Sequence, residues 1–487
     1  GIFIATKFCG DGSCLTNVGS ASTNAWAADS QENLVAGNGA GAARDADTCF
    51  NIMIGCNAGP VLNAGDHNLL LGCKAGLLLT SGGCNIIAGR YAGTSAAASS
   101  LNVFIGDQAG MYSVGCRNVF IGKDAGASCS SADQAGASDH IAIGYQSGYC
   151  LDTGASNTFL GKYAGRNVTS GNQNVYLGHG AGYTATTGSK NVAVGFNAAS
   201  AALTGGDNVF IGSQAGQNAT SAESNIAIGE LAMSSTGAAL TSEYNIALGY
   251  KAGCKVSSGS NNIIMGKQTN YNGVLTGHNN FFGGYYTAKT ATSAACNIAL
   301  GYKSAESITT ANNNITLGAQ TGKNIGTGAC NVFIGKDAGE SLGTAADNDA
   351  SENIAIGHQA GMYLTTGDNN IAIGKESGRY LGVGNANISI GQNAGKSSGT
   401  PGDNTAEQNV SIGQNAGTTL TTGSGNVFLG PNAGKEATTQ SNNVFIGDKA
   451  GQYRNGGGRN IALGYYALFG NSTPANNTGY YNIAFGA

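Results

Sequence analysis

Short apolar segments separated by small and polar residues follow one another along almost the whole chain. In residues 353–369, NIAIGHQAGMYLTTGDN, Ile354 and Ile356 alternate with Asn353 and Ala355, which is the pattern of a short β-strand with one buried face. Gly357 follows this segment and permits a corner, and a Thr-Thr-Gly-Asp run turns the chain back. The pattern therefore predicts a strand, a tight corner and a return turn within one short repeat.

The same phrase, Asn-x-x-x-Gly-x-x-Ala-Gly, begins 26 times between Asn33 and Asn482, and seventeen of the 25 intervals are 17 residues long. Only His140 replaces the leading Asn, and the fifth position is always Gly. A fixed period is typical of solenoids, in which a coil buries its apolar residues only by stacking on its neighbours. We therefore predict an all-β protein, a parallel β-solenoid or β-roll of about 26 coils over residues 33–487, preceded by a junction or capping segment, residues 1–32.

Two positions of the phrase are expected to have structural roles. Asparagines one coil apart can pair their side-chain amides along a parallel stack and fix its register. This ladder is expected at Asn51, Asn68, Asn85, Asn102, Asn174, Asn191, Asn208, Asn353, Asn370, Asn426 and Asn443. Corner glycines are expected at Gly55, Gly72, Gly106, Gly178, Gly357 and Gly447. A ligand array on the asparagines is the alternative, but the low variation of the phrase favours a structural role.

Composition supports a narrow core and excludes several classes of protein. Gly accounts for 81 residues, and charged residues make up 10% of the chain, against about 25% in typical soluble domains. Disorder is the alternative for such a chain, but the recurring Val, Ile and Leu positions argue against it. The net charge of −4 and the lack of a basic run indicate no positively charged surface that would bind the phosphates of a nucleic acid. No apolar stretch is long enough to predict a membrane span.

The sequence contains no constellation typical of catalysis or metal binding. Each of the five His residues takes the place of a repeat position, with His179 and His358 both at the sixth, whereas a catalytic His needs a carboxylate and a nucleophile beside it. Asp residues are irregular, unlike those of calcium-binding solenoid repeats. Thr pairs such as Thr365 and Thr366 are interrupted in neighbouring coils, which argues against an ice-binding face. We therefore expect no enzymatic activity, no cofactor and no metal array.

Cysteines and sequons suggest covalent modification. Twelve cysteines without zinc-like spacing favour an oxidising, extracellular setting, and small buried thiols in place of Ala or Ser are the alternative. Cys56 and Cys73 share a position in adjacent coils, where stacking places their Cα atoms ~4.8 Å apart, within disulfide range. The candidate disulfide residues are Cys9, Cys14, Cys56, Cys73, Cys129 and Cys150. The candidate glycosylation sites, in the loop half of their coils, are Asn167, Asn218, Asn471 and Asn476.

The repeated phrase resembles that of known fibrous proteins. NIAIGHQAG and its variants are similar to the head repeat of trimeric autotransporter adhesins and to Gly-rich repeats of phage and algal-virus tail-fibre proteins. The resemblance covers residues 33–487 and implies a left-handed parallel β-roll with three chains side by side. The N-terminal GIFIATKFCGDGSCLTNV resembles linker segments of tail-fibre-like proteins. The coils here are longer than the adhesin repeat and contain more Cys, so the repeat by itself does not decide between a single-chain solenoid and a trimer.

We expect a non-enzymatic extracellular structural fibre protein that polymerises head-to-tail into filaments. The sequence ends part-way through a coil, and an open coil edge could accept residues 1–32 of the next subunit by strand addition. The alternative is a trimeric adhesin or viral tail-fibre shaft that binds a cell-surface receptor or glycan. A solenoid polysaccharide lyase or hydrolase would need clustered carboxylates or a basic site, neither of which the sequence indicates. The expected partner is another copy of the chain, with no nucleic acid and no membrane span.

Overall fold

The computed structural model of the protein describes residues 28–128, 136–235, 239–341, 348–398, 404–471 and 479–486. Each strand in these residues is three residues long, and the chain divides into two units, Gly1–Thr153 (unit 1) and Gly154–Ala487 (unit 2). The strands of unit 1 are β1 (Leu34–Ala36), β2 (Ile52–Ile54), β3 (Leu69–Leu71), β4 (Ile86–Ala88), β5 (Val103–Ile105), β6 (Val119–Ile121) and β7 (Ile141–Ile143).

Unit 2 contains the remaining 19 strands, again one in each coil. They are β8 (Thr158–Leu160), β9 (Val175–Leu177), β10 (Val192–Val194), β11 (Val209–Ile211), β12 (Ile226–Ile228), β13 (Ile246–Leu248), β14 (Ile263–Met265), β15 (Phe281–Gly283), β16 (Ile298–Leu300), β17 (Ile315–Leu317), β18 (Val332–Ile334), β19 (Ile354–Ile356), β20 (Ile371–Ile373), β21 (Ile388–Ile390), β22 (Val410–Ile412), β23 (Val427–Leu429), β24 (Val444–Ile446), β25 (Ile461–Leu463) and β26 (Ile483–Phe485).

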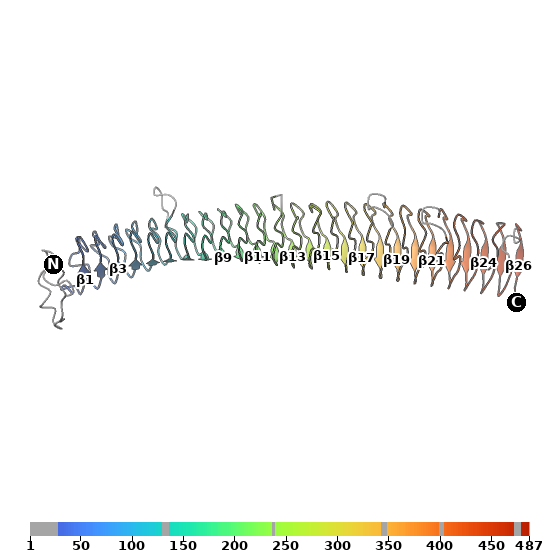
Figure 1. Ribbon diagram of the computed structural model, residues 1–487, viewed down its shortest axis with the longest axis horizontal. Helices are drawn as coiled ribbons and strands as arrows, with labels where there is room; N and C mark the ends of the chain where they lie inside the picture. Colours follow the sequence, from blue (N-terminus) through green and yellow to red (C-terminus); the bar gives the residue numbers. More distant parts are fainter. Residues whose placement is uncertain are drawn as a thin grey trace, which may run out of the picture. The chain divides into compact units, whose positions relative to one another are not determined.

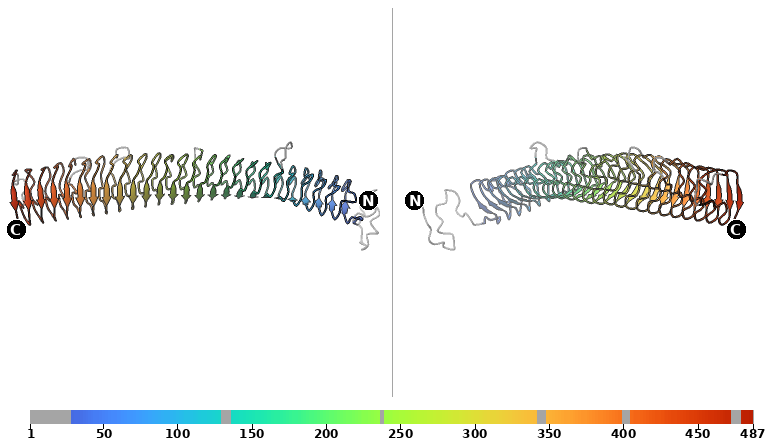
Figure 2. Two further views of the ribbon diagram at one scale, coloured as in Figure 1. Left: turned by 180° about the vertical axis from the view of Figure 1, so that it is seen from behind. Right: turned by 45° about the vertical axis from the view of Figure 1, so that its right-hand side comes forward.

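Within each unit, each strand pairs with the strand of the next coil in parallel and at the same repeat position. Ile354, Ala355 and Ile356 of β19, for example, lie against Ile371, Ala372 and Ile373 of β20. Figure 1 and Figure 2 show the strands of each unit stacked one after another on the same side of the coils. The predicted all-β parallel β-solenoid with a repeat of about 17 residues is therefore confirmed.

The buried face of the strands is the opposite of the one that apolar alternation suggests. In β19 the central residue Ala355 and the preceding Asn353 have no exposed surface, whereas Ile354 and Ile356 are each 36% exposed. The same order, with a buried residue between two partly exposed ones, recurs from β8 to β25. Successive side chains of a strand point to opposite faces of the sheet. Because Asn353 points into the coil, Ala355 does so too, and Ile354 and Ile356 must point outward.

A narrow interior explains this arrangement. The space inside a coil is filled by the central strand residue, by the small residue before the second glycine of the phrase, such as Ala360, and by an apolar residue of the return half, such as Leu364. Where the central residue is aromatic, rings of adjacent coils stack, as in Phe159 and Tyr176, whose centroids lie 5.2 Å apart. Dispersion contacts between small, closely stacked side chains therefore replace the large core of a globular domain.

Candidate functional site

Within each unit, the leading asparagines are linked from coil to coil by hydrogen bonds and form a ladder. The backbone N–H of Asn353 donates to Oδ1 of Asn331 at 3.0 Å, and Nδ2 of Asn353 donates to the same oxygen at 3.2 Å. Nδ2 also donates to the carbonyls of Ser351 and Gly367, both at 2.9 Å. One side chain thus ties a coil to the coil before it and ties the end of its own coil back to its start.

The same backbone contact to the preceding coil holds the other predicted ladder residues. All of them are at most 2% exposed, and their backbone N–H groups lie 2.8–3.1 Å from Oδ1 of the preceding ladder asparagine. These residues are Asn51, Asn68, Asn85, Asn102, Asn174, Asn191, Asn208, Asn370, Asn426 and Asn443. His140 keeps the backbone part of the pattern, because its N–H donates to Oδ1 of Asn118 at 2.9 Å. The ladder amides are therefore buried and hydrogen-bonded, which leaves them little capacity to bind a ligand.

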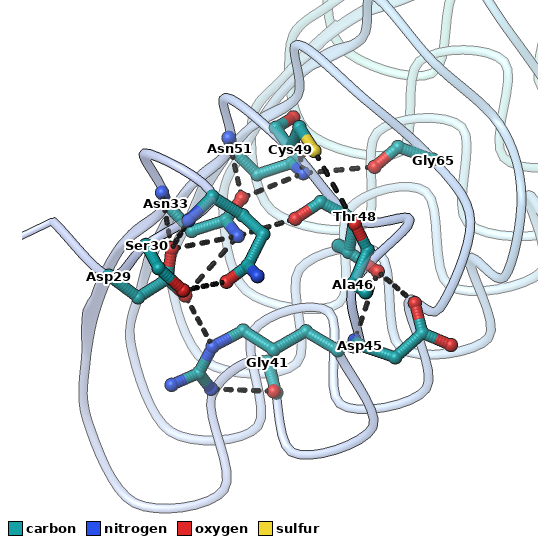
Figure 3. Close-up of polar contacts among 12 residues, drawn as sticks. Asp29, Ser30, Asn33, Gly41, Asp45, Ala46, Thr48, Cys49, Asn51 and Gly65 are labelled. Atoms are coloured by element: carbon teal, nitrogen blue, oxygen red, sulfur yellow. Dashed lines mark hydrogen bonds and ion pairs between the residues drawn. The ribbon is translucent and has the colours of Figure 1, made fainter.

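The first asparagine of the ladder is capped by an acidic residue that sequence reasoning missed (Figure 3). Oδ1 of Asp29 accepts hydrogen bonds from the backbone and the side chain of Asn33 at 2.8 and 3.2 Å, in the way that a preceding asparagine would. Nε of Arg44 donates to the other carboxylate oxygen at 3.0 Å. Burial raises the pKa of Asp29, but the hydrogen bonds from Asn33 and Arg44 outweigh it and hold the pKa below its usual value. Asp29 therefore closes the ladder as an anion.

The corner glycines adopt a backbone conformation that other residues avoid. Gly357 has φ of 134°, and a Cβ atom placed on it would lie 2.7 Å from the carbonyl oxygen of Gly374 in the next coil. The other predicted corner glycines, Gly55, Gly72, Gly106, Gly178 and Gly447, have φ between 123° and 139°. Side-chain-free corners let successive coils approach at backbone contact. The corner glycine is therefore required by both torsion angle and space.

The outward residues of the strands in unit 2 form what we call the outer apolar face. Each strand from β8 to β26 contributes its first and third residues, and all but Thr158 and Gly283 are Val, Ile, Leu, Met or Phe. Ile228, Met265 and Ile298, for example, are 40, 40 and 39% exposed. No charged residue occupies an outward strand position in the described coils of unit 2. The face is therefore a strip of apolar side chains that repeats once per coil.

The interior provides little room for a small-molecule ligand. The pocket lined by Phe120, Ala137 and Leu151 in unit 1 has a volume of about 10 Å³, as does the pocket lined by Ile325 and Phe333 in unit 2. Such a volume holds about one water molecule, whereas ligand sites usually measure hundreds of Å³. The described residues contain no group of three or more His, Cys, Asp or Glu side chains that could hold a metal ion.

The predicted disulfide between Cys56 and Cys73 is wrong, because both side chains are exposed free thiols. Their coils are in the expected register, since the N–H of Lys74 donates to the carbonyl of Cys56 at 2.8 Å. Stacked residues have parallel Cα–Cβ bonds, so their Cβ atoms stay ~4.8 Å apart, beyond the ~3.5–4.5 Å that a disulfide requires. The candidates Cys9, Cys14 and Cys129, the last proposed near Cys150, lie outside the described residues.

The other predicted or chemically interesting residues lie apart from one another. Of the candidate glycosylation sites, Asn167 and Asn218 are half-buried. Asn167 accepts a hydrogen bond from Arg166, and Asn218 donates one to the carbonyl of Ser235. Asn471 is exposed, and Asn476 lies outside the described residues. The five histidines have different neighbours: His67 stacks on Phe50, His140 on Phe120 and His179 on Phe196, while His278 accepts from the Ser260 N–H and His358 lies 3.9 Å from Asp337. These residues do not converge on a shared site.

Comparison with known proteins adds no assignment. A scan against protein-family models found no matching family, and a search of curated proteins found no match. None of the described residues forms a helix with the length and apolar character needed to cross a membrane.

Proposed function

We propose that the chain is a non-enzymatic structural fibre protein whose shaft assembles with copies of itself through the outer apolar face. The observation that carries this proposal is the size of the face. Full burial of an Ile side chain corresponds to roughly 60–120 Å² of apolar area. Fourteen of the 38 outward residues of unit 2 are 36% exposed or more and the others are half-buried, so together they present on the order of 1,000 Å² of apolar surface.

An apolar area of this size exceeds what a monomer usually presents to water. The largest apolar patch on a typical monomeric protein is about 300–600 Å², and a stable protein interface buries about 800 Å² per partner. Covering the outer apolar face would also exclude water from a surface that bears no charge in the described coils of unit 2. Its burial against a partner is therefore favourable along the whole length of unit 2.

The repeat of the face argues for a second copy of the chain as that partner. One pair of apolar side chains recurs every ~4.8 Å along the stack. A partner can match this spacing over many coils only if it has the same spacing. Another copy of the chain has this spacing because it consists of the same stacked coils. Two such faces would pack as sheets in a sandwich do, with side chains interdigitating about 10 Å between the sheets.

Head-to-tail polymerisation through residues 1–32 remains a prediction, since residues 1–27 lie outside the described part of the chain. Within the described part, the first ladder position already has an acceptor, Asp29, so the structure favours lateral association over extension of the ladder there. The extracellular location also remains a prediction, and the free thiols of Cys56 and Cys73 remove one argument for it. A trimer, as in the adhesin-like alternative, is one of the assemblies that lateral packing can give.

Mass measurement of an outer-face variant tests the proposal. The full-length variant I228K/M265K/I356K/I412K places four charges on residues that are 36–40% exposed, so it should keep the fold but oppose burial of the face. The matched control, S258K/S293K/T366K/T422K, adds the same charge at exposed positions of the return turns. By light scattering, we expect oligomers for the wild type and the control and a monomer for the outer-face variant. A monomeric wild type, or an outer-face variant that assembles as the wild type does, would contradict the proposal.

A further inference from the structure

A second surface of unit 2 has a chemistry that the outer apolar face lacks. The two residues after each corner glycine face solvent at a corner of the coil, and in the four coils of β13–β16 they are mostly Lys and Tyr. We call this surface the Lys–Tyr patch and define it by Tyr250, Lys251, Lys267, Tyr285, Tyr302 and Lys303. These residues are 16–18 positions apart from coil to coil, so no basic run appears in the sequence and the patch becomes visible only when the coils are stacked.

Backbone hydrogen bonds place the residues of the patch in register. The N–H of Gln268 donates to the carbonyl of Tyr250 at 2.9 Å, and the N–H of Lys303 donates to the carbonyl of Tyr285, also at 2.9 Å. Successive coils are therefore offset by one coil spacing of ~4.8 Å along the stack. The patch is a straight row of side chains with a fixed step.

The lysines of the patch are held against tyrosine rings. Nζ of Lys251 lies 5.2 Å from the ring centroid of Tyr250, Nζ of Lys267 lies 5.6 Å from that of Tyr285, and Nζ of Lys303 lies 5.7 Å from that of Tyr302. Cation–π contacts at this distance favour one position of a flexible chain. The ammonium groups are therefore partly ordered before any ligand arrives, which lowers the entropy that binding must remove.

Positive charge in this region is compensated at Lys289, Lys303 and Lys323, which lie within 3.7 Å of Glu306 or Glu340, but not at Lys251 and Lys267. Between Gly249 and Lys323 the chain has six lysines and one acidic residue, Glu306, although its net charge is −4. Glu306 lies 3.5 Å from Lys303 and 3.7 Å from Lys289, whereas Lys251 and Lys267 make no ion pair with a described residue. In other coils lysines do meet carboxylates, as in Lys396 and Glu376. Lys251 and Lys267 thus lie beside the rings of Tyr250 and Tyr285 and not beside a carboxylate of the described residues.

We propose that the Lys–Tyr patch binds a linear polyuronate, a polysaccharide with one carboxylate on each sugar ring. The charge spacing is compatible, because the patch carries three lysines in four coils and an extended pyranose chain advances by nearly one coil spacing per sugar. Lysine ammonium groups would pair with the carboxylates, and the exposed tyrosine edges of Tyr285 and Tyr302 would contact sugar rings and hydroxyl groups.

A nucleic acid fits the patch less well. Its phosphates wind around a helix at one charge per ~1.7 Å of axis in a duplex, which a straight row with ~4.8 Å steps does not follow. Single strands bind by stacking bases on open aromatic faces, but the rings of Tyr285 and Tyr286 stack on each other with centroids 4.1 Å apart. The row of edges and ammonium groups therefore favours the polyuronate. This inference is independent of the proposed self-association.

Binding of polymannuronate oligosaccharides to the immobilised full-length protein tests the inference. We expect saturable binding that weakens as salt rises, because the contacts are exposed ion pairs. The variant K251Q/K267Q/K303Q should weaken binding about tenfold, since exposed charge pairs contribute modestly one by one. The variant Y285L/Y302L, which leaves the net charge unchanged, should weaken it by a smaller but measurable factor. The matched control K190Q/K336Q/K375Q, which removes three exposed lysines outside the patch, should bind as the wild type does.

Four results would overturn the inference. Equal losses in K251Q/K267Q/K303Q and in the control variant would mean that only net charge matters. Unchanged binding by the variant Y285L/Y302L would remove the role of the tyrosines. Tighter binding of dextran sulfate or of single-stranded DNA than of polymannuronate would assign the patch to a different polyanion. Binding of neutral dextran would show that the carboxylates are not needed. Circular dichroism of each variant shows whether the β-structure is intact, so a loss of binding can be separated from a loss of fold.

Discussion

Removing one ladder amide should loosen the solenoid locally and strongly. In the variant N353A, the carbonyl of Gly367 loses the donor that lies 2.9 Å away, and the backbone N–H and Nδ2 of Asn370 lose the acceptor at 2.9 and 3.1 Å. Both asparagines are at most 1% exposed, so water cannot replace these partners without opening the coil. Each buried group left without a partner costs about 1–3 kcal/mol. The three groups together would lose about 3–9 kcal/mol in a rigid coil, and partial relaxation of the coil brings the expected loss of local stability to roughly 3–6 kcal/mol.

Hydrogen exchange with mass spectrometry measures this loss coil by coil. In a solenoid each coil contacts only its neighbours, so a defect should stay near the coil that carries it. A loss of roughly 3–6 kcal/mol corresponds to exchange about 100- to 10,000-fold faster in peptides that contain Asn370. Peptides around Asn191 should exchange as in the wild type. The control variant N63A removes an exposed asparagine and should change exchange little. Acceleration below about tenfold at Asn370 would refute the view that the ladder holds the coils in register.

Two further outcomes follow from the corners and the thiols. The variant G357A should destabilise the protein more than G361A, by ~2 kcal/mol or more, because Gly357 has φ of 134° whereas Gly361 has φ of 55°, a conformation that Ala adopts at modest cost. Thermal melts compare them, and equal melting temperatures would contradict the assignment. Alkylation under non-denaturing conditions should modify Cys56 and Cys73 quickly and Cys254 slowly, because burial raises the pKa of the Cys254 thiol and shields it. Slow labelling of Cys56 would contradict its exposure.

The sequence was sufficient to predict the coil, its period and the ladder, because one phrase repeats and each of its residues has a single structural use. Gly357 and Asn353 could be placed from one sequence, since a residue type required at every coil reveals a backbone constraint. The direction of the strand residues could not be inferred by apolarity alone. Ile354 is more hydrophobic than Ala355, yet Ala355 fits the narrow interior and Ile354 does not.

The surfaces that we connect with function were hidden from the sequence for different reasons. The outer apolar face was misassigned to the interior, because alternation defines two faces without saying which one is buried. The Lys–Tyr patch joins residues such as Lys251 and Lys267 that come together only when the coils are stacked. The Asp29 cap could have been suspected from an acidic residue four positions before the first ladder asparagine. The expected disulfide failed because Cα spacing was considered without the direction of the side chains.

Hydroxyl-radical footprinting of the assembled wild-type protein tests most directly whether the outer apolar face is an interface. Met265 and Ile356 are 40 and 36% exposed in the single chain, and Tyr244, outside the face, is 57% exposed. If copies pack through the face, Met265 and Ile356 should be strongly protected from oxidation in the wild type at assembling concentrations, while Tyr244 reacts freely. On dilution to monomers, the protection should disappear. Oxidation of Met265 and Ile356 that follows their single-chain exposure at every concentration would show that the face stays open to water and would contradict the proposed assembly.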